Sequence, residues 1–139
     1  MLERFLGVLS LTLMLAGSAT GQSKPIKSKE PISDGRPLSE WIGDLKAPAP
    51  QTRNAAAYEI AGMGPAAAAA VPALIVALED PIPAVRFPAI VALMEIGPAA
   101  KAAVPRLRQV EEEDINDEIA AAARRALKRI QPEAASGPP

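Results

Sequence analysis

The sequence predicts an all-α protein, an α-solenoid of about three antiparallel helix pairs. Three observations predict it: a repeat with a period of 33 residues, apolar residues at helical spacing inside each repeat, and a composition with 49 % hydrophobic but only 3 % aromatic residues. Much of the hydrophobic content is alanine, and small side chains suit helices packed closely side by side. A β-sheet would instead be enriched in β-branched and aromatic residues.

The repeat is marked by residue types that have special backbone roles. Gly64-Pro65 recurs as Gly97-Pro98, and Val71-Pro72 recurs as Val104-Pro105. The last unit has one extra residue before its second helix, so its second half aligns at a shift of 34 residues. Coincidences of this kind indicate tandem helix pairs. We predict a repeat domain at 37–131, with units at 37–64, 65–97 and 98–131.

Apolar residues of the second unit fall on one face of each predicted helix. The first helix carries Val71, Leu74, Ile75 and Leu78, and the second carries Val85, Ala89, Ala92, Leu93 and Ile96. The second helices are predicted to begin at Pro50, Pro83 and Asp117. Proline is well tolerated at a first helical position, because its missing N–H has no partner there. Before Asp117, Asn116 is a good N-cap.

The Gly-Pro pairs are predicted to end the second helices. Gly64 and Gly97 can take the left-handed conformation after the last turn, and the prolines that follow cannot continue the helix. Pro72 and Pro105 interrupt the alanine-rich stretches that come next. We therefore expect a short helical turn, a bend, and then a main helix that starts near each of these prolines.

These residues resemble a known family. The strings GPAAAAAVPALIVALED and GPAAKAAVPRLRQVEEED look like the HEAT-like repeats first recognised in phycobilisome lyases. Such units show a Gly-Pro, a Val-Pro-x-Leu and a Val-Arg-x-x-Ala-x-x-Ala-Leu second helix. Val85, Arg86, Ala89 and Leu93 match the last pattern, whereas Pro88 departs from it. The resemblance covers about 38–130 and implies an architecture, since the family includes enzymes, adaptors and scaffolds.

The N-terminus has the layout of a secretory signal peptide. Residues 1–21 carry Arg4, an apolar run from Phe5 to Ala16, and then small residues. Cleavage is expected near residues 19–21, after Ala19 or before Gln22, which places the protein in the periplasm or outside the cell. The alternative is an uncleaved helix that anchors the chain. Residues 22–36 are predicted to be a flexible linker, and 132–139 a disordered tail.

The composition argues against several functions. The chain has neither cysteine nor histidine, which removes thiolate and imidazole metal ligands and the side chain most used in acid–base catalysis. Its net charge of −1 offers no general attraction to nucleic acid. We therefore predict a protein that is not an enzyme, that needs no cofactor or metal, that binds no nucleic acid and that has no membrane span in its mature form.

A ridge on the second helices is the candidate partner-binding surface. Opposite the core stripe of the central helix, Phe87, Val91 and Met94 follow one another at i, i+4 and i+7. Exposed apolar patches often mark interaction sites. The alternative is that neighbouring helices simply enclose this helix. The ridge as predicted comprises Asn54 and Tyr58 in unit one, Phe87, Val91 and Met94 in unit two, and Arg125 and Lys128 in unit three.

Other charged residues have simpler structural explanations. Arg53 and Arg86 match the repeat's usual arginine and are expected to bond an acid or a carbonyl group of a neighbouring turn. The acidic run of 111–118 could hold a divalent cation, but it lacks the spacing of a calcium loop. Negative charge at the start of a helix and the basic residues of 124–129 near its end complement the helix dipole.

The sequence thus predicts a scaffold or interaction module that binds a protein or peptide through this ridge. Two alternatives stay open. One is a bilin lyase or lyase-accessory protein that holds a tetrapyrrole, as the resemblance implies. The other is a structural repeat whose open ends self-associate weakly.

Leu74 tests the core assignment. We expect Leu74→Ala to lower the free energy of unfolding by ~2–5 kcal/mol, because it leaves a cavity between packed helices. Chemical denaturation measures this change, and a loss below about 0.5 kcal/mol would argue that Leu74 lies outside the core.

Overall fold

The computed structural model describes residues 29–132. The predicted signal peptide at 1–21, the first part of the predicted linker at 22–28 and nearly all of the predicted tail, 133–139, lie outside the described residues.

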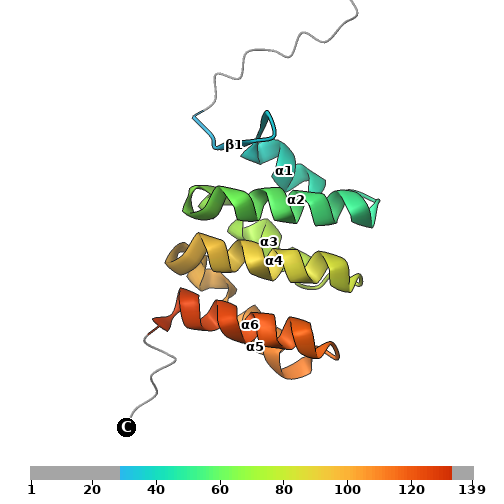
Figure 1. Cartoon of the computed structure of the whole chain (residues 1–139), viewed down its shortest axis with the longest axis vertical. Helices are drawn as coiled ribbons and strands as arrows, with labels where there is room; N and C mark the ends of the chain where they lie inside the picture. The colour runs from blue at the N-terminus through green and yellow to red at the C-terminus, as the bar shows by residue number, and fades with distance from the viewer. Residues whose placement is uncertain (1–28, 133–139) are drawn as a thin grey trace, which may run out of the picture.

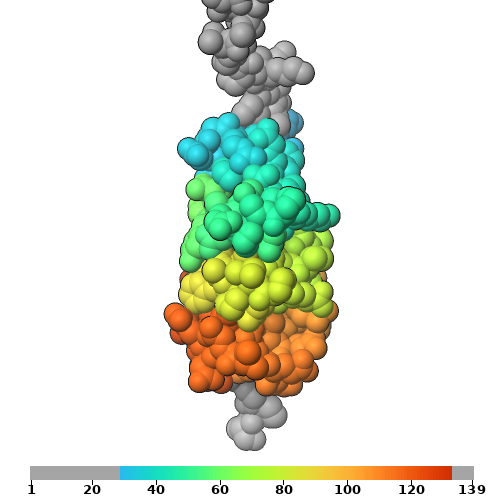
Figure 2. Space-filling view, turned by 90° about the vertical axis from the view of Figure 1, so that its right-hand side faces the viewer, coloured from blue at the N-terminus to red at the C-terminus, as the bar shows by residue number. Residues whose placement is uncertain are grey.

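The described chain forms a stack of helix pairs in two layers (Figure 1). The first layer holds α1 (Leu38–Asp44), α3 (Val71–Ala77) and α5 (Val104–Glu113), and the second holds α2 (Pro50–Met63), α4 (Pro83–Ile96) and α6 (Asp117–Ile130). A small hairpin, β1 (Ile32–Ser33) and β2 (Arg36–Pro37), precedes them. In Figure 2 the units follow one another as successive bands from the N-terminal to the C-terminal end. This all-α solenoid is the predicted fold class.

The second helices begin where the sequence predicts. Pro50, Pro83 and Asp117 are the first residues of α2, α4 and α6. The Asn116 side chain accepts hydrogen bonds from the backbone N–H groups of Glu118 and Ile119, at 3.0 and 3.3 Å. These bonds satisfy two N–H groups that a helix start leaves without partners.

Both Gly-Pro pairs end a second helix, but with a different backbone geometry from the one predicted. Gly64 and Gly97 have positive φ angles of 58° and 77°, as expected, yet their ψ angles of −139° and −141° lie outside the left-handed helical region. Positive φ with strongly negative ψ is accessible almost only to glycine. It turns the chain into the 3-10 segments η2 (Gly64–Ala70) and η3 (Gly97–Ala103). The predicted sequence of turn, bend and main helix is confirmed, since Ala67 and Ala100 leave the helical region within them.

The predicted linker at 22–36 is wrong in its last part, because residues 32–37 form the β1–β2 hairpin. Asp34 and Gly35 both have positive φ, which suits a two-residue hairpin turn. The Trp41 indole donates to the Ser33 carbonyl at 3.1 Å, and the Arg36 guanidinium lies 4.0 Å from the Trp41 ring centre. The hairpin is therefore held against the first unit, with the Arg36 guanidinium over the Trp41 ring.

The core is a continuous cluster of small and branched apolar side chains. Leu74 and Leu93 are fully buried, and Trp41 is 6 % exposed. All five residues predicted for the buried stripe of α4 are buried, as are three of the four predicted for α3, Ile75 being half-buried. Within residues 29–132 no polar or charged residue is fully buried. The most extensive contact between helices joins α2 to α4, and both helices carry buried alanines.

Two helical runs, Pro50–Ala77 and Pro83–Glu113, are apolar and long enough to cross a membrane by length and composition alone. Each is bent by a positive-φ glycine and a 3-10 segment, so that α2 and α3, or α4 and α5, lie in different layers (Figure 1). Core helices of soluble proteins show the same composition, so these runs are weak support for a span.

Pro88 lies inside α4, where it is buried. In a regular helix the Ala84 carbonyl would accept the backbone N–H of residue 88, and proline has none. The Asn54 side chain of α2 supplies the missing donor, since its amide nitrogen lies 2.5 Å from the Ala84 oxygen. Pro88 therefore has a structural consequence: it frees a carbonyl group that ties α2 to α4.

A double-mutant cycle tests this link. Asn54→Ala should lower the free energy of unfolding by ~1 kcal/mol in the wild type, because the Ala84 carbonyl loses its donor. In a Pro88→Ala background the backbone N–H of residue 88 can bond that carbonyl, and the same change should cost almost nothing. Urea denaturation of the four proteins measures the coupling. Equal costs in the two backgrounds would show that Pro88 and Asn54 are independent.

Candidate functional site

A shallow groove of about 360 Å³ lies across the first halves of the second helices. The α2 side contributes Asn54 and Tyr58, and the α6 side contributes an acidic residue, Glu118. Tyr58 is 48 % exposed, and Phe87 is half-buried between the two sides. The groove is lined by Asn54, Tyr58, Pro83, Ala84, Phe87, Asn116, Glu118 and Ile119.

The seven residues of the predicted ridge do not all meet in this groove. Asn54, Tyr58 and Phe87 line it together. Val91 and Met94 continue along α4, half-buried and packed against the core. On α6, Arg125 is exposed and outside the groove lining, whereas Lys128 lines a different pocket. The α4 ridge is thus partly enclosed by its neighbours and partly accessible.

A ladder of arginine–aspartate pairs holds the turns that precede the second helices. Arg53 of the first unit bonds Asp80 of the second through two nitrogens, at 2.6 and 3.1 Å. Arg86 of the second unit bonds Asp114 of the third in the same way, at 2.9 and 3.2 Å. The predicted structural role of both arginines is confirmed. Bidentate pairs fix orientation as well as distance, so each unit is set relative to the next.

Each arginine of the ladder also bonds backbone carbonyl groups. Nη1 of Arg53 donates to the carbonyls of Ala47 and Pro48 at 2.8 and 2.9 Å, and Nη1 of Arg86 donates to the carbonyl of Asp80 at 2.8 Å. These bonds satisfy turn carbonyls that no helix can pair. The starts of α2 and α4, which form one end of the groove, are positioned by them.

Comparison with known proteins agrees with the repeat fold. Residues 38–128 match the family model described as HEAT repeats. The chain belongs to the HEAT repeat family. The match does not single out the phycobilisome-lyase type that the sequence suggested. No curated protein and no solved structure gave a significant match.

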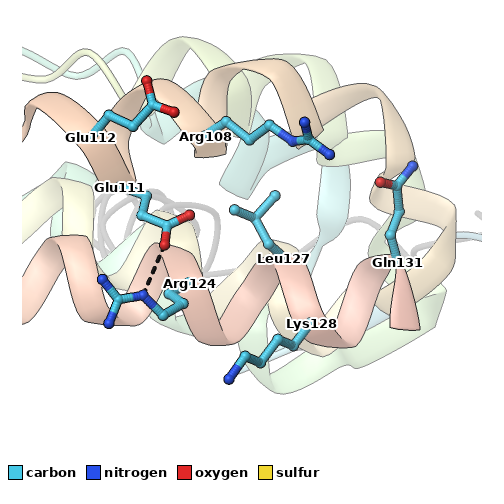
Figure 3. Close-up of a pocket in the computed structure, with 7 residues that line it drawn as sticks. All are labelled: Arg108, Glu111, Glu112, Arg124, Leu127, Lys128 and Gln131. Carbon is cyan, nitrogen blue, oxygen red and sulfur yellow. Dashed lines mark hydrogen bonds and ion pairs between the residues drawn. The ribbon is translucent and has the colours of Figure 1, made fainter. Parts of the chain in front are cut away.

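The last HEAT unit carries a second pocket, of about 310 Å³, at its outer side (Figure 3). Arg108, Glu111 and Glu112 come from α5, and Arg124, Leu127 and Lys128 come from α6. The Arg124 Nε atom lies 2.8 Å from Glu111 Oε1. Charges of both signs therefore cover the end of the array, as a polar capping unit requires.

The carboxylates of the acidic run at 111–118 bond to several different residues. Glu111 bonds Arg124, Asp114 bonds Arg86, and Glu113 accepts a hydrogen bond from Gln109. In the part of the chain that the structure describes, no group of three or more potential metal-ligating side chains comes together. The arrangement favours ion pairing and helix-end complementation for these carboxylates.

Sequence reasoning missed the acidic side of the groove. The sequence predicts only helix-start roles for Asn116 and Glu118, and Asn116 does cap α6. The repeat alignment contains a signal for this side of the groove. At a shift of 34 residues Glu118 is equivalent to Ala84, which lies one turn before Phe87. Adjacent second helices in a HEAT array lie in register, so equivalent positions become neighbours across the surface.

Two aspartates of the ladder have lowered pKa values. Burial by itself raises the pKa of Asp80, but hydrogen bonds from Arg53 and the Ile82 N–H, with the charges of Arg53 and Arg86, outweigh burial. Burial likewise raises the pKa of Asp114, and hydrogen bonds from Arg86 and the Asn116 N–H, with the charge of Arg86, bring it below its ordinary value. Both groups therefore stabilise the fold when ionised.

The pH dependence of stability tests the ladder. Because the folded pKa lies below the unfolded one, the stabilisation by Asp80 and Asp114 is complete above about pH 4 and is lost as the pH falls through the folded pKa. Asp80→Asn should lower the free energy of unfolding by ~1–3 kcal/mol at pH 7. That difference from wild type should shrink towards pH 2.

Urea unfolding at pH 7, 4 and 2 measures the effect, with the exposed Glu112→Gln as the control for loss of a carboxylate. A difference between Asp80→Asn and wild type that is the same at all three pH values would contradict the ionic role of the ladder.

Proposed function

We propose that this HEAT repeat chain is an exported interaction module that binds a protein or peptide partner through its second-helix face, the outward surface of α2, α4 and α6. HEAT repeats commonly mediate protein–protein interaction or scaffolding. The observation that carries the proposal is the groove in which Tyr58 is exposed and Phe87 is partly accessible. Accessible aromatic side chains are characteristic of residues that dominate binding energy at protein interfaces.

The proposed role is non-enzymatic. HEAT repeats are generally non-catalytic, and the chain has no histidine or cysteine. Tyr58 and Glu118 are the titratable residues of the groove lining. An interaction role needs only shape and complementary chemistry, which these residues supply.

Two further hypotheses come from the sequence, a tetrapyrrole-holding role and self-assembly. The ladder bears on self-assembly, because its pattern stops at both ends of the array. The position equivalent to Asp80 in unit one is Ala47, and the position equivalent to Arg86 in unit three is Ala120. A further copy stacked at either end would lack the arginine–aspartate pair. This favours a partner on the second-helix face over end-to-end stacking.

Affinity capture with the C-terminally tagged full-length chain tests the proposal. Proteins from the cell-envelope and secreted fractions are captured by wild type and by Phe87→Asp. We expect a partner held by wild type to be lost at least tenfold in Phe87→Asp, because a charge is placed in the centre of the groove.

Val76→Asp is the matched control, since Val76 is 60 % exposed on α3 in the other layer. It should retain the partner, and circular dichroism should show all three proteins folded. Equal capture by wild type and Phe87→Asp would overturn the proposed site. The mass of the purified wild-type chain tests export, since cleavage near residues 19–21 removes the N-terminal segment.

A further inference from the structure

The second-helix face has an ordered distribution of charge. Glu118 is the charged residue of the groove lining, and Arg125 lies seven residues further along the same helix, α6. Both are exposed, and within residues 29–132 neither side chain forms an ion pair. Two other basic residues of α6 do form ion pairs: Arg124 bonds Glu111 at 2.8 Å, and Arg129 lies 4.0 Å from Glu95. Glu118 and Arg125 are thus among the charged groups of α6 left for a partner, together with the exposed Asp117 near its start and Lys128 near its end.

Apolar side chains run beside these two charges on the adjacent helix. At the 34-residue shift, Ala84 and Val91 of α4 are equivalent to Glu118 and Arg125 of α6. Phe87 and Val91 lie along this length, and Met94 follows one turn beyond it; the three are spaced at i, i+4 and i+7, and all are half-buried. Helical partners commonly lay an apolar face with this spacing into a groove between helices. The face therefore offers an apolar track with an acidic residue near one end and a basic residue further along it.

The acidic end of the track also has extra acceptor character. The Asn54 amide nitrogen is held at the Ala84 carbonyl because Pro88 provides no donor for it. The amide oxygen of Asn54 is therefore the end of that side chain left to accept a hydrogen bond. Together with the Glu118 carboxylate and the Tyr58 ring in the same groove, it suits a cationic side chain.

We propose that the second-helix face binds an amphipathic helix of a partner protein, antiparallel to α4, with an acidic residue facing Arg125 and a basic residue facing Glu118. This inference rests on the proposed function and adds the chemistry and direction of the partner. Seven helical residues rise about 10.5 Å, so the two partner charges lie seven residues apart, the acidic one first.

Helix dipoles favour this direction. α2, α4 and α6 all run the same way, so their positive N-terminal ends lie together at the groove (Figure 1). An antiparallel partner places its negative C-terminal end there. A helix is itself stabilised by acidic residues near its N-terminus and basic residues near its C-terminus. The same orientation therefore matches side-chain charges, helix dipoles and the partner's own stability.

A phage-displayed library of helical peptides tests the proposal on the full-length chain. Two positions seven residues apart admit Asp, Glu, Lys or Arg, and the positions between them that share their face admit apolar residues. Selection should enrich peptides with the acidic residue first. A synthetic peptide of that order should bind about tenfold more tightly than the peptide with the two charges exchanged, by fluorescence anisotropy.

A charge exchange on the protein gives the decisive comparison. In Glu118→Lys/Arg125→Glu the preferred order should reverse, with the basic residue first. The matched control is Arg108→Glu/Glu112→Lys, which exchanges two exposed charges on α5 and should leave the order unchanged. Selection without any charge order, an order that persists in the first variant, or failure to select any peptide above the Phe87→Asp background would overturn the inference.

These outcomes are separable from failure of the proposed function. If the captured natural partner depends on Phe87 while the peptides show no charge order, the face is a binding site and the assigned direction is wrong. If the natural partner is captured equally by wild type and Phe87→Asp, the proposed site itself fails, and the peptide inference fails with it.

Discussion

The close packing of α2, α4 and α6 is the constraint on which the rest of the structure depends. A single helix pair cannot bury its apolar stripe, so each unit needs a neighbour. α2 and α4 are in extensive contact, and both contain fully buried alanines, such as Ala57 and Ala92, whose small side chains allow close packing. Because this layer is in register, equivalent residues of successive units become neighbours, and both the ladder and the groove follow from that.

The arginine–aspartate ladder and the apolar packing of the second helices both set the position of each unit relative to the next, but in different ways. Burial of small apolar side chains is non-directional and would tolerate some sliding of one helix on another. The pairs of Arg53 with Asp80 and of Arg86 with Asp114 are directional, and they fix each turn to the next. The side chains of these pairs are between 6 and 15 % exposed, so water screens them only partly. Register along the array, and with it the spacing of charges on the second-helix face, is therefore well defined.

The backbone hydrogen bond that Pro88 removes from α4 is replaced by a contact with another helix. A proline inside a helix usually costs ~3 kcal/mol, in part because a carbonyl loses its donor. Here the carbonyl of Ala84 accepts a hydrogen bond from the Asn54 amide of α2, and Asn54 then lies in the groove with its oxygen available. The irregularity and the chemistry of the candidate site are thus linked through one hydrogen bond. The same bond connects the first two units independently of the ladder.

The sequence by itself determined the architecture. Gly-Pro pairs, prolines at helix starts and apolar residues at helical spacing act through local backbone preferences, so the helix starts at Pro50 and Pro83 and the buried stripe of α4 could be predicted before any contact was known. The tertiary structure decided which predicted ridge residues meet in the groove and which other residues join them. Lys128 lines the end pocket and Glu118 enters the groove because neighbouring helices determine which flank of α6 is open. Asn54 bonds a carbonyl 30 residues away, and the hairpin at 32–37 is held by Trp41. Such contacts join residues that are distant in the chain, and no local preference encodes them.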